Sequence, residues 1–82
     1  MGITPGQFAA EEKTKEKLQK RIGKNIKRER MFRKMTQEQL GRKVGSSKRH
    51  IQYTEAGKKG ISLWKLHQIA SALGQAMYQF LL

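Results

Sequence analysis

Apolar residues recur along the chain at the three- and four-residue spacing of helices, in several short segments. Leu18, Ile22 and Ile26 follow one another at intervals of four, within a run of strong helix formers that starts near Glu11. Their stripe is narrow and Lys and Arg flank it on nearly every side, so this helix is expected to bury one edge and leave the rest in water. No segment has the pattern of a strand, and the chain is therefore predicted to be all-α.

Capping residues divide the rest of the chain into shorter helices. Thr36 followed by Gln39 matches a capping box, in which a hydroxyl and an amide each satisfy a backbone N–H at a helix start. Gly45 is placed to end that helix in the left-handed conformation, and Ser46 and Ser47 offer N-caps for the next one. The expected apolar anchors of these two helices are Leu40, Val44 and Ile51.

A loop at residues 56–60 precedes one more amphipathic helix and a final apolar turn. Ser62 is expected to cap this helix and Gly74 to end it. The apolar positions of the two segments are Leu63, Leu66, Ile69, Ala70 and Leu73, then Met77, Phe80 and Leu81. We therefore expect a compact five-helix domain whose basic first helix is extended.

The first residues have a different composition. Gly2, Pro5 and Gly6 stand among few apolar anchors, so residues 1–12 are expected to form a mobile tail before a domain at residues 13–82. Thr4 and Pro5 could alternatively begin a short helix, with Thr4 as the N-cap and Pro5 as the first helical residue.

The chain is strongly basic, with 18 Lys and Arg against 6 Asp and Glu among its 82 residues and a net charge of +12. Residues 13–34 hold eleven basic residues against Glu16 and Glu29, which gives +9 in that segment alone. Such an excess on a small body predicts a polyanionic partner, with nucleic acid as the leading candidate. The basic run of residues 13–34 could alternatively be a solvated helix face.

Several classes of protein are not supported by the composition. Without cysteine there is no disulfide framework, zinc-thiolate site or thiol nucleophile, and an intracellular, cytoplasmic location is expected. No stretch has the length of a membrane span, and no signal-peptide pattern opens the chain. His50 and His67 lie seventeen residues apart without an acidic cluster, so no metal or other cofactor is predicted. No paired acids, Ser/His/Asp set or Gly-rich phosphate loop indicates an enzyme.

Residues 37–56 combine two short helices around a glycine turn, which is the spacing that a helix-turn-helix requires. Gly41 is small where two helices are expected to cross closely. The second helix, at about residues 47–55, leaves its outward side chains free to enter a groove of nucleic acid. These outward residues are Lys48, Arg49, Gln52 and Tyr53.

Three short motifs stand at fixed distances from one another. The segments 36–40, 55–57 and 69–74 contain Thr-Gln-Glu-x-Leu, Glu-x-Gly and Ile-Ala-x-x-Leu-Gly. Together, at these spacings, they resemble the Cro/phage-repressor, or XRE-type, helix-turn-helix family over about residues 20–82. The resemblance implies a five-helix domain that binds double-stranded operator DNA, usually as a two-fold homodimer, with the recognition helix in the major groove.

The resemblance also implies roles for individual residues. The implied base-reading residues are Lys48, Arg49, Gln52 and Tyr53, since Arg can pair with guanine and Gln with adenine. The implied phosphate contacts are Gln37, Ser47, Lys58 and Lys59. Arg30 and Glu55 stand where the family often has an ion pair that braces the first helix against the recognition helix. Gln37 could instead be an ordinary first-turn residue, and Tyr53 could pack on the surface.

The chain departs from the family pattern at three positions. Lys34 stands where glycine is usual, so that turn is expected either to be built differently or to carry slight strain. Glu29 occupies a position that is often apolar, which would leave the first helix thinly anchored. Thr54 replaces a larger apolar residue, so loose packing is expected behind the recognition helix.

The final apolar turn leaves hydrophobic side chains that need cover. Met77, Phe80 and Leu81 are the expected homodimer seam, although they could belong to the core. Trp64 could likewise be a dimer contact or a partly exposed core residue.

The sequence therefore predicts a prokaryotic or phage transcriptional regulator that binds a palindromic operator as a homodimer. An alternative is a protein-interaction module, such as an antitoxin or co-regulator, with the same fold. A third, an architectural or RNA-binding protein driven by charge alone, would leave the capping and turn chemistry of residues 36–47 unexplained.

Overall fold

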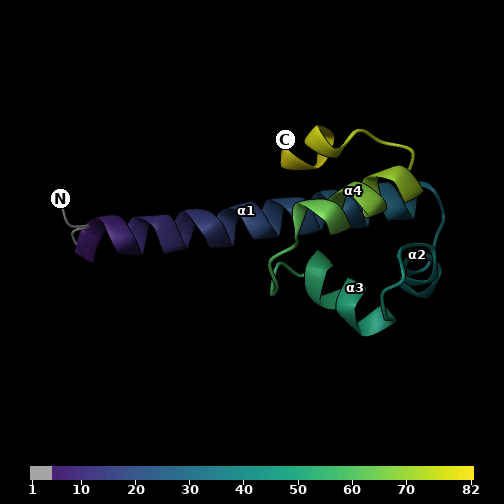
Figure 1. Cartoon of the computed structure of the whole chain (residues 1–82), viewed down its shortest axis with the longest axis horizontal. Coiled ribbons are helices and arrows are strands. Elements are labelled where there is room, and N and C mark those ends of the chain that lie inside the picture. The colour runs from purple at the N-terminus through teal and green to yellow at the C-terminus, as the bar shows by residue number, and fades with distance from the viewer. Residues whose placement is uncertain (1–4) are drawn as a thin grey trace.

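A computed structural model describes residues 5–82 of the chain, and the side chains of residues 13–82. It contains four α-helices, α1 (Pro5–Phe32), α2 (Gln37–Val44), α3 (Lys48–Glu55) and α4 (Leu63–Ala72), followed by the 3-10 helix η1 (Met77–Leu81). Figure 1 shows α1 as a long rod, with α2 and α3 below it, η1 above it and α4 in front of its C-terminal half in this view. The predicted all-α fold with an extended first helix is confirmed.

Helix α1 begins at Pro5, the first helical position of the alternative that we considered for this region. Thr4, the N-cap in that alternative, lies outside the described residues. The backbone of residues 5–12 is thus helical and runs without a break into the basic segment that starts at residue 13. The mobility of residues 1–12 stays a prediction. The N-terminal part of α1 extends beyond all the other described elements (Figure 1).

The hydrophobic core lies where the C-terminal half of α1 meets the other four elements. Its buried residues are Ile22, Ile26, Leu40, Val44, Ile51, Leu66, Ile69, Ala70, Leu73 and Phe80. Two residues of the expected apolar stripes are not buried, since Leu18 is 42% and Leu63 72% exposed. Among residues 13–82, each precedes the first buried apolar residue of its helix, so the periodicity identified the right face but not how far along the helix the core reaches.

The predicted helix ends are confirmed. The Thr36 hydroxyl accepts the backbone N–H of Gln39 at 3.0 Å, and the Gln39 side-chain oxygen accepts the backbone N–H of Thr36 at 2.8 Å. Gly45 ends α2 with a φ of 66°, in the left-handed region. The hydroxyls of Ser47 and Ser62 accept backbone N–H groups in the first turns of α3 and α4.

Two of the three departures from the family pattern are packed differently from what we expected. Thr54 is buried, its hydroxyl donates to the carbonyl of His50 at 2.9 Å, and Gly23 of α1 lies directly against its backbone. A Cβ atom on Gly23 would be 2.4 Å from the Thr54 carbonyl oxygen, so the absent side chain lets α1 and α3 touch. Beside the half-buried Glu29, the buried Asn25 donates to the Phe80 carbonyl at 2.9 Å and thereby ties α1 to η1.

The third departure, Lys34, carries the backbone strain that we expected, with a φ of 56°. It follows the end of α1 in a Schellman arrangement. The N–H of Met35 donates to the Arg30 carbonyl at 3.1 Å, and that of Lys34 donates to the Met31 carbonyl at 2.9 Å. Glycine is favoured at this position because it adopts the left-handed region without a Cβ penalty.

Replacing Lys34 by glycine is expected to raise the free energy of unfolding by about 0.5–1 kcal/mol, since relief of left-handed strain exceeds the entropic cost of glycine. Urea denaturation followed by helical circular dichroism measures the change. Lys34→Ala removes the same charge but keeps the Cβ atom, and it is the matched control. Equal stability of the glycine and alanine variants would show that backbone strain at this position has no measurable cost.

Candidate nucleic-acid interface

The turn between α2 and α3 is fixed by backbone hydrogen bonds and by the absence of one side chain. The N–H groups of Gly45 and Ser46 both point to the carbonyl of Gly41, the latter at 2.8 Å. A Cβ atom on Gly41 would lie 2.5 Å from the Ser46 carbonyl oxygen. Gly41 was expected to allow two helices to cross, but it makes room for the turn itself. This geometry sets the direction in which α3 leaves the turn.

Helix α3 has one buried and one exposed face. Ile51 and Thr54 are almost fully buried, and the side chain of Glu55 is only 3% exposed. On the other face Lys48, Arg49 and Gln52 are exposed, while Tyr53 is half-buried. Lys48 and Gln52 are four residues apart, as are Arg49 and Tyr53, so each pair forms a row along the helix, and the two rows lie about 100° apart on its outward side. They therefore project outward from a helix that is anchored along its back.

Arg49 and Tyr53 lie against each other on this face. The Arg49 Nε–H donates to the Tyr53 hydroxyl at 3.0 Å, and the guanidinium carbon lies 5.5 Å from the centre of the ring. This contact occupies Nε and the inner side of the guanidinium. The two terminal nitrogens, which form the bidentate pair with a guanine edge, are not used in it. The sequence pattern placed these residues on one face but did not indicate that Tyr53 holds Arg49.

Gln37 lies at the start of α2 and contacts the C-terminal end of α3. Its side-chain nitrogen donates to Glu55 Oε1 at 3.1 Å. Gln37 is half-buried, so its side chain links two elements in addition to any external contact. Ser47 is exposed at the start of α3, where its oxygen accepts the N–H of His50 at 3.1 Å.

Lys58 and Lys59 are exposed in the loop that follows α3. The loop begins at Gly57, which has a φ of 71° and packs directly on α1. A Cβ atom on Gly57 would lie 2.8 Å from the Cα atom of Lys20. The loop lysines are consequently held beside both α3 and the exposed basic residues of α1.

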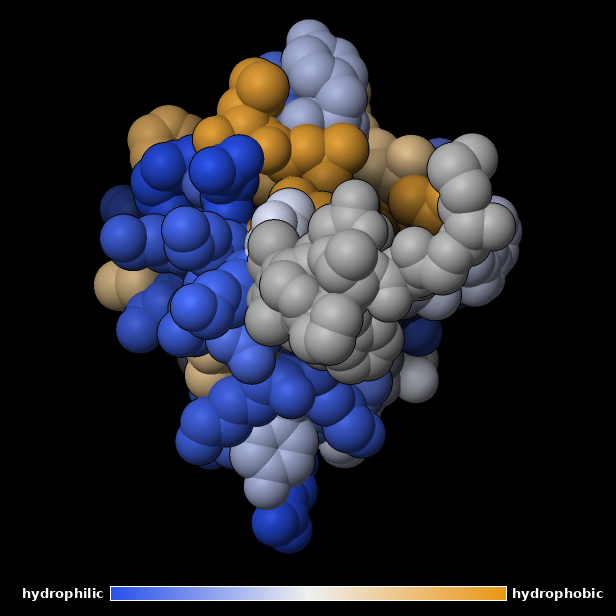
Figure 2. Space-filling model, turned by 90° about the vertical axis from the view of Figure 1, so that its left-hand side faces the viewer, coloured by the Kyte–Doolittle hydropathy of each residue, from blue (hydrophilic) through white to orange (hydrophobic). Residues whose placement is uncertain are grey.

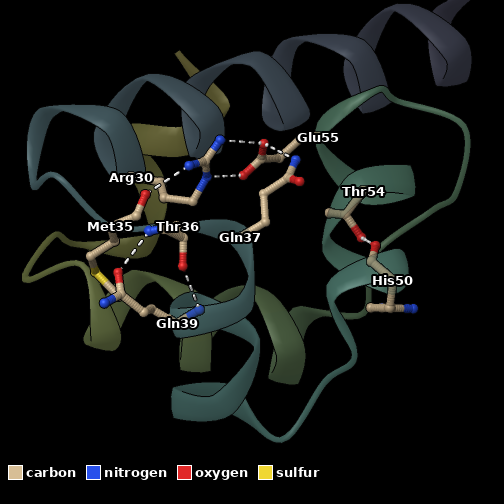
Figure 3. A network of polar contacts seen from close by, with 8 residues as sticks. All are labelled: Arg30, Met35, Thr36, Gln37, Gln39, His50, Thr54 and Glu55. Atoms are coloured by element: carbon tan, nitrogen blue, oxygen red, sulfur yellow. Dashed lines mark hydrogen bonds and ion pairs between the residues drawn. The ribbon is translucent and has the colours of Figure 1, made fainter.

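A buried polar network connects α1, α2 and α3, as Figure 3 shows. Arg30 forms two hydrogen bonds with Glu55, from Nε to Oε2 at 2.7 Å and from a terminal nitrogen to Oε1 at 3.1 Å. The other terminal nitrogen donates to the carbonyl of Met35 at 2.7 Å. With Gln37 also bonded to Glu55, the carboxylate has three donors, and the ends of three helices are fixed to one another.

The exposed cations of the interface have no acidic partner within ion-pair distance among the side chains that the structure describes. Among residues 13–82 the two ion pairs are Arg30–Glu55 and the exposed Glu38–Arg42. Positive charge on α3 and its following loop is therefore available to an external anion. The candidate interface comprises Gln37, Ser47, Lys48, Arg49, Gln52, Tyr53, Lys58 and Lys59.

The residues expected at a dimer seam do not share one environment. Phe80 is 1% exposed and fills the core of its own chain, so it cannot be a surface contact between two chains. The reason is that η1 folds back on α1 and turns this side chain inward. Met77 is partly buried against the same core, while Leu81 is 39% exposed. Trp64 is also exposed, and its ring lies 5.6 Å from that of His67.

Three features that help to position the interface were not found from the sequence. They are the contact of Gly23 with α3, the hydrogen bond from Asn25 to Phe80, and a bond from Lys65 Nζ to the Val44 carbonyl at 2.7 Å. Gly23 gave one signal that could have been used. A glycine within a run of strong helix formers weakens the helix by about 1 kcal/mol, which indicates close packing.

Among residues 13–82 no group of three His, Cys, Asp or Glu side chains is placed to hold a metal ion. Within the described part of the chain, no helix combines the length and the apolar character needed to cross a membrane.

Comparison with known protein families gives a match to a helix-turn-helix family. A helix-turn-helix family model matches residues 26–78, which includes the last part of α1, all of α2, α3 and α4, and the start of η1. A search of curated proteins gives no significant match. The family match covers every residue of the candidate interface, and it leaves out the first part of α1.

Proposed function

Because the chain belongs to the Cro/C1-type, or XRE, helix-turn-helix family of DNA-binding regulators, we propose that it is a sequence-specific transcriptional regulator that places α3 in the major groove. The observation that carries this proposal is the outward face of α3. Lys48, Arg49 and Gln52 are exposed there without acidic partners, on a helix that is buried along its back.

Within this proposal the interface residues have two kinds of role. Lys48, Arg49 and Gln52 read base edges, with Tyr53 orienting the guanidinium of Arg49. Ser47, Lys58, Lys59 and Gln37 contact phosphates, which sets the position of the protein on the duplex without reading sequence. Gln37 keeps its oxygen and one N–H for this contact, since one N–H is bonded to Glu55.

We further propose that two chains bind a palindromic operator, with recognition helices about 34 Å apart, the length of one helical turn of DNA. Exposed apolar residues gather at the C-terminal end, where Tyr78 is 62%, Leu81 39% and Leu82 81% exposed. Together with Met77 they offer a surface for a second copy. Action on DNA implies that the protein works in the cytoplasm, in contact with the nucleoid.

The test begins with selection of preferred sites from a random duplex library by the purified protein. Replacing Arg49 by alanine is then expected to reduce discrimination between the selected site and its single-base variants by about 1–3 kcal/mol, since a bidentate base contact is lost. Fluorescence anisotropy with labelled duplexes measures both affinities.

Lys59→Ala is the matched control, because it also removes one exposed cation. It should weaken binding to all duplexes alike and lower the slope of log affinity against log salt by about one. Failure of the unaltered protein to select any sequence at moderate salt would contradict the proposed function. A tight stoichiometric protein partner together with weak DNA binding would favour the antitoxin or co-regulator alternative.

A further inference from the structure

One face of α1 is covered by basic side chains that the DNA-reading unit does not use. They are Lys13, Lys17, Lys20, Arg21, Lys24, Lys27 and Arg28, and all seven are exposed. Successive residues of an α-helix are separated by about 100° around its axis, which places these seven on one side, opposite the buried Ile22 and Ile26. We call this surface the α1 basic face.

Within the described side chains, no member of the α1 basic face has an acidic partner within ion-pair distance. The two ion pairs among residues 13–82 involve none of its members. Of its seven residues, Lys13, Lys17, Lys20, Arg21 and Lys24 precede residue 26, where the family match begins. The charge is thus concentrated in a part of α1 that the family match does not cover.

The α1 basic face is continuous with the lysine loop after α3. Lys20 lies at its edge and packs against Gly57, which is directly followed by Lys58 and Lys59. Gly23, about a sixth of a turn further round the helix, touches the backbone of α3. Figure 2, a view from the N-terminal end of α1, shows a continuous hydrophilic surface down one side and across the bottom, where α3 lies.

The size and spacing of this face fit a nucleic-acid backbone. From Lys13 to Arg28 it extends over about 22 Å, at 1.5 Å for each residue. Measured along the axis of a duplex, the phosphates of one strand follow one another about every 3.4 Å. A face of this length laid along the axis therefore spans about six base pairs. An anionic membrane is a poorer match, because Ile22 and Ile26 are buried in the core. The exposed apolar residues Leu18, Met31 and Phe32 form no continuous apolar stripe on α1 that could enter lipid.

We propose that the α1 basic face binds the phosphate backbone of the same duplex, beyond the base pairs that α3 reads. This inference rests on the proposed function, because it assumes that α3 is already seated in a groove. From the lysine loop the face leads toward the N-terminal part of α1, which extends past the other elements (Figure 1). The contact adds affinity that depends on flanking DNA and on salt, and it carries no sequence preference.

The test compares two triple variants with the same change in charge. Lys17→Gln, Arg21→Gln and Lys24→Gln neutralise the centre of the α1 basic face, and Gln preserves helix propensity. Lys15→Gln, Arg33→Gln and Lys43→Gln neutralise three exposed residues elsewhere. Circular dichroism checks that both triples are folded. Affinity is measured by anisotropy on a duplex that ends at the selected site and on the same duplex extended at both ends.

We expect the first triple to reduce the salt slope on the extended duplex by roughly 0.9 for each lost contact, thus by 2–3 units in all. The second triple should change it much less, and both triples should keep the sequence preference of the unaltered protein. The unaltered protein should bind the extended duplex more tightly than the short one, and this difference in affinity should shrink only in the first triple.

Equal effects of the two triples would overturn the inference, because the charge would then act only at long range. The inference would also be overturned if the first triple bound structured RNA, or vesicles of phosphatidylcholine and phosphatidylglycerol, more weakly than the unaltered protein but kept its affinity for the extended duplex. Failure of the proposed function has a different signature, namely the absence of any sequence preference in the unaltered protein. The two failures are therefore distinguishable within one set of measurements.

Discussion

Replacing Glu55 by alanine is expected to lower the free energy of unfolding by about 3–5 kcal/mol, because it leaves the buried guanidinium of Arg30 without its counter-ion. The side chain of Arg30 is 10% exposed and that of Glu55 only 3%. Two of the three hydrogen bonds that Arg30 makes go to this carboxylate, and Gln37 loses its partner as well. Urea denaturation measures the loss, which is a large part of the ~4–12 kcal/mol expected for a domain of this length.

Glu38→Ala is the matched control, since it removes another glutamate that forms an ion pair. That pair joins Glu38 to Arg42 at 2.7 Å, but the side chains are 60% and 75% exposed. Its loss should therefore cost less than about 0.5 kcal/mol. If both alanine variants showed the same small decrease in the free energy of unfolding, the buried ion pair would not stabilise the contact between α1 and α3.

Two further variants keep the test informative if Glu55→Ala does not fold. Glu55→Gln retains the shape of the side chain and one hydrogen-bond acceptor. Its free energy of unfolding should therefore fall between those of Glu55→Ala and the unaltered protein. The double variant Arg30→Met with Glu55→Leu removes both charges. It is expected to be more stable than Glu55→Ala, because no buried charge is left unpaired.

The parts of the fold that follow from the sequence are those decided over a few residues. The capping box of Thr36 and Gln39 joins atoms three residues apart, and Gly45 needs only its own backbone freedom to end α2. Ser62 and Gly74 bound α4 for the same reasons. Such interactions are encoded by residue type and spacing, so they can be read without knowing where the other helices lie.

The arrangement of these helices depends on contacts between distant parts of the chain. Asn25 and Phe80 are 55 residues apart, and Gln37 and Glu55 are 18 apart. Nothing in the local pattern around either pair selects the partner. The close approach of α1 and α3 at Gly23 depends likewise on the absence of a side chain, which a hydrophobic pattern does not register.

The candidate interface was predictable as a face, but its internal contacts were not. Helical spacing is enough to put Lys48, Arg49 and Gln52 on one side of α3, because Ile51 must point inward. The hydrogen bond between Arg49 and Tyr53 depends on rotamers, which the sequence leaves open. The exposure of Phe80 was misjudged because an apolar residue near a chain end fits both a core and a dimer seam.

Phe80→Ala is expected to lower the free energy of unfolding by about 3–5 kcal/mol, since it removes the largest fully buried side chain among the described residues and leaves a cavity. The cavity would open between α1 and α4, the elements against which η1 packs. Asn25 would still be able to donate to the backbone carbonyl of residue 80, so the loss reports packing rather than a broken hydrogen bond. Urea denaturation at several protein concentrations measures the effect.

The dependence on concentration separates the core role of Phe80 from a role in a dimer. Replacing a core residue lowers stability by the same amount at every protein concentration. Replacing a residue of a dimer seam lowers stability only at concentrations where the chains associate. Leu81→Ala is the comparison, because Leu81 neighbours Phe80 and is 39% exposed. It should change the association measured by sedimentation equilibrium and leave the dilute protein almost as stable. If Phe80→Ala instead mattered only at high concentration, Phe80 would belong to the seam and η1 would be packed differently against α1.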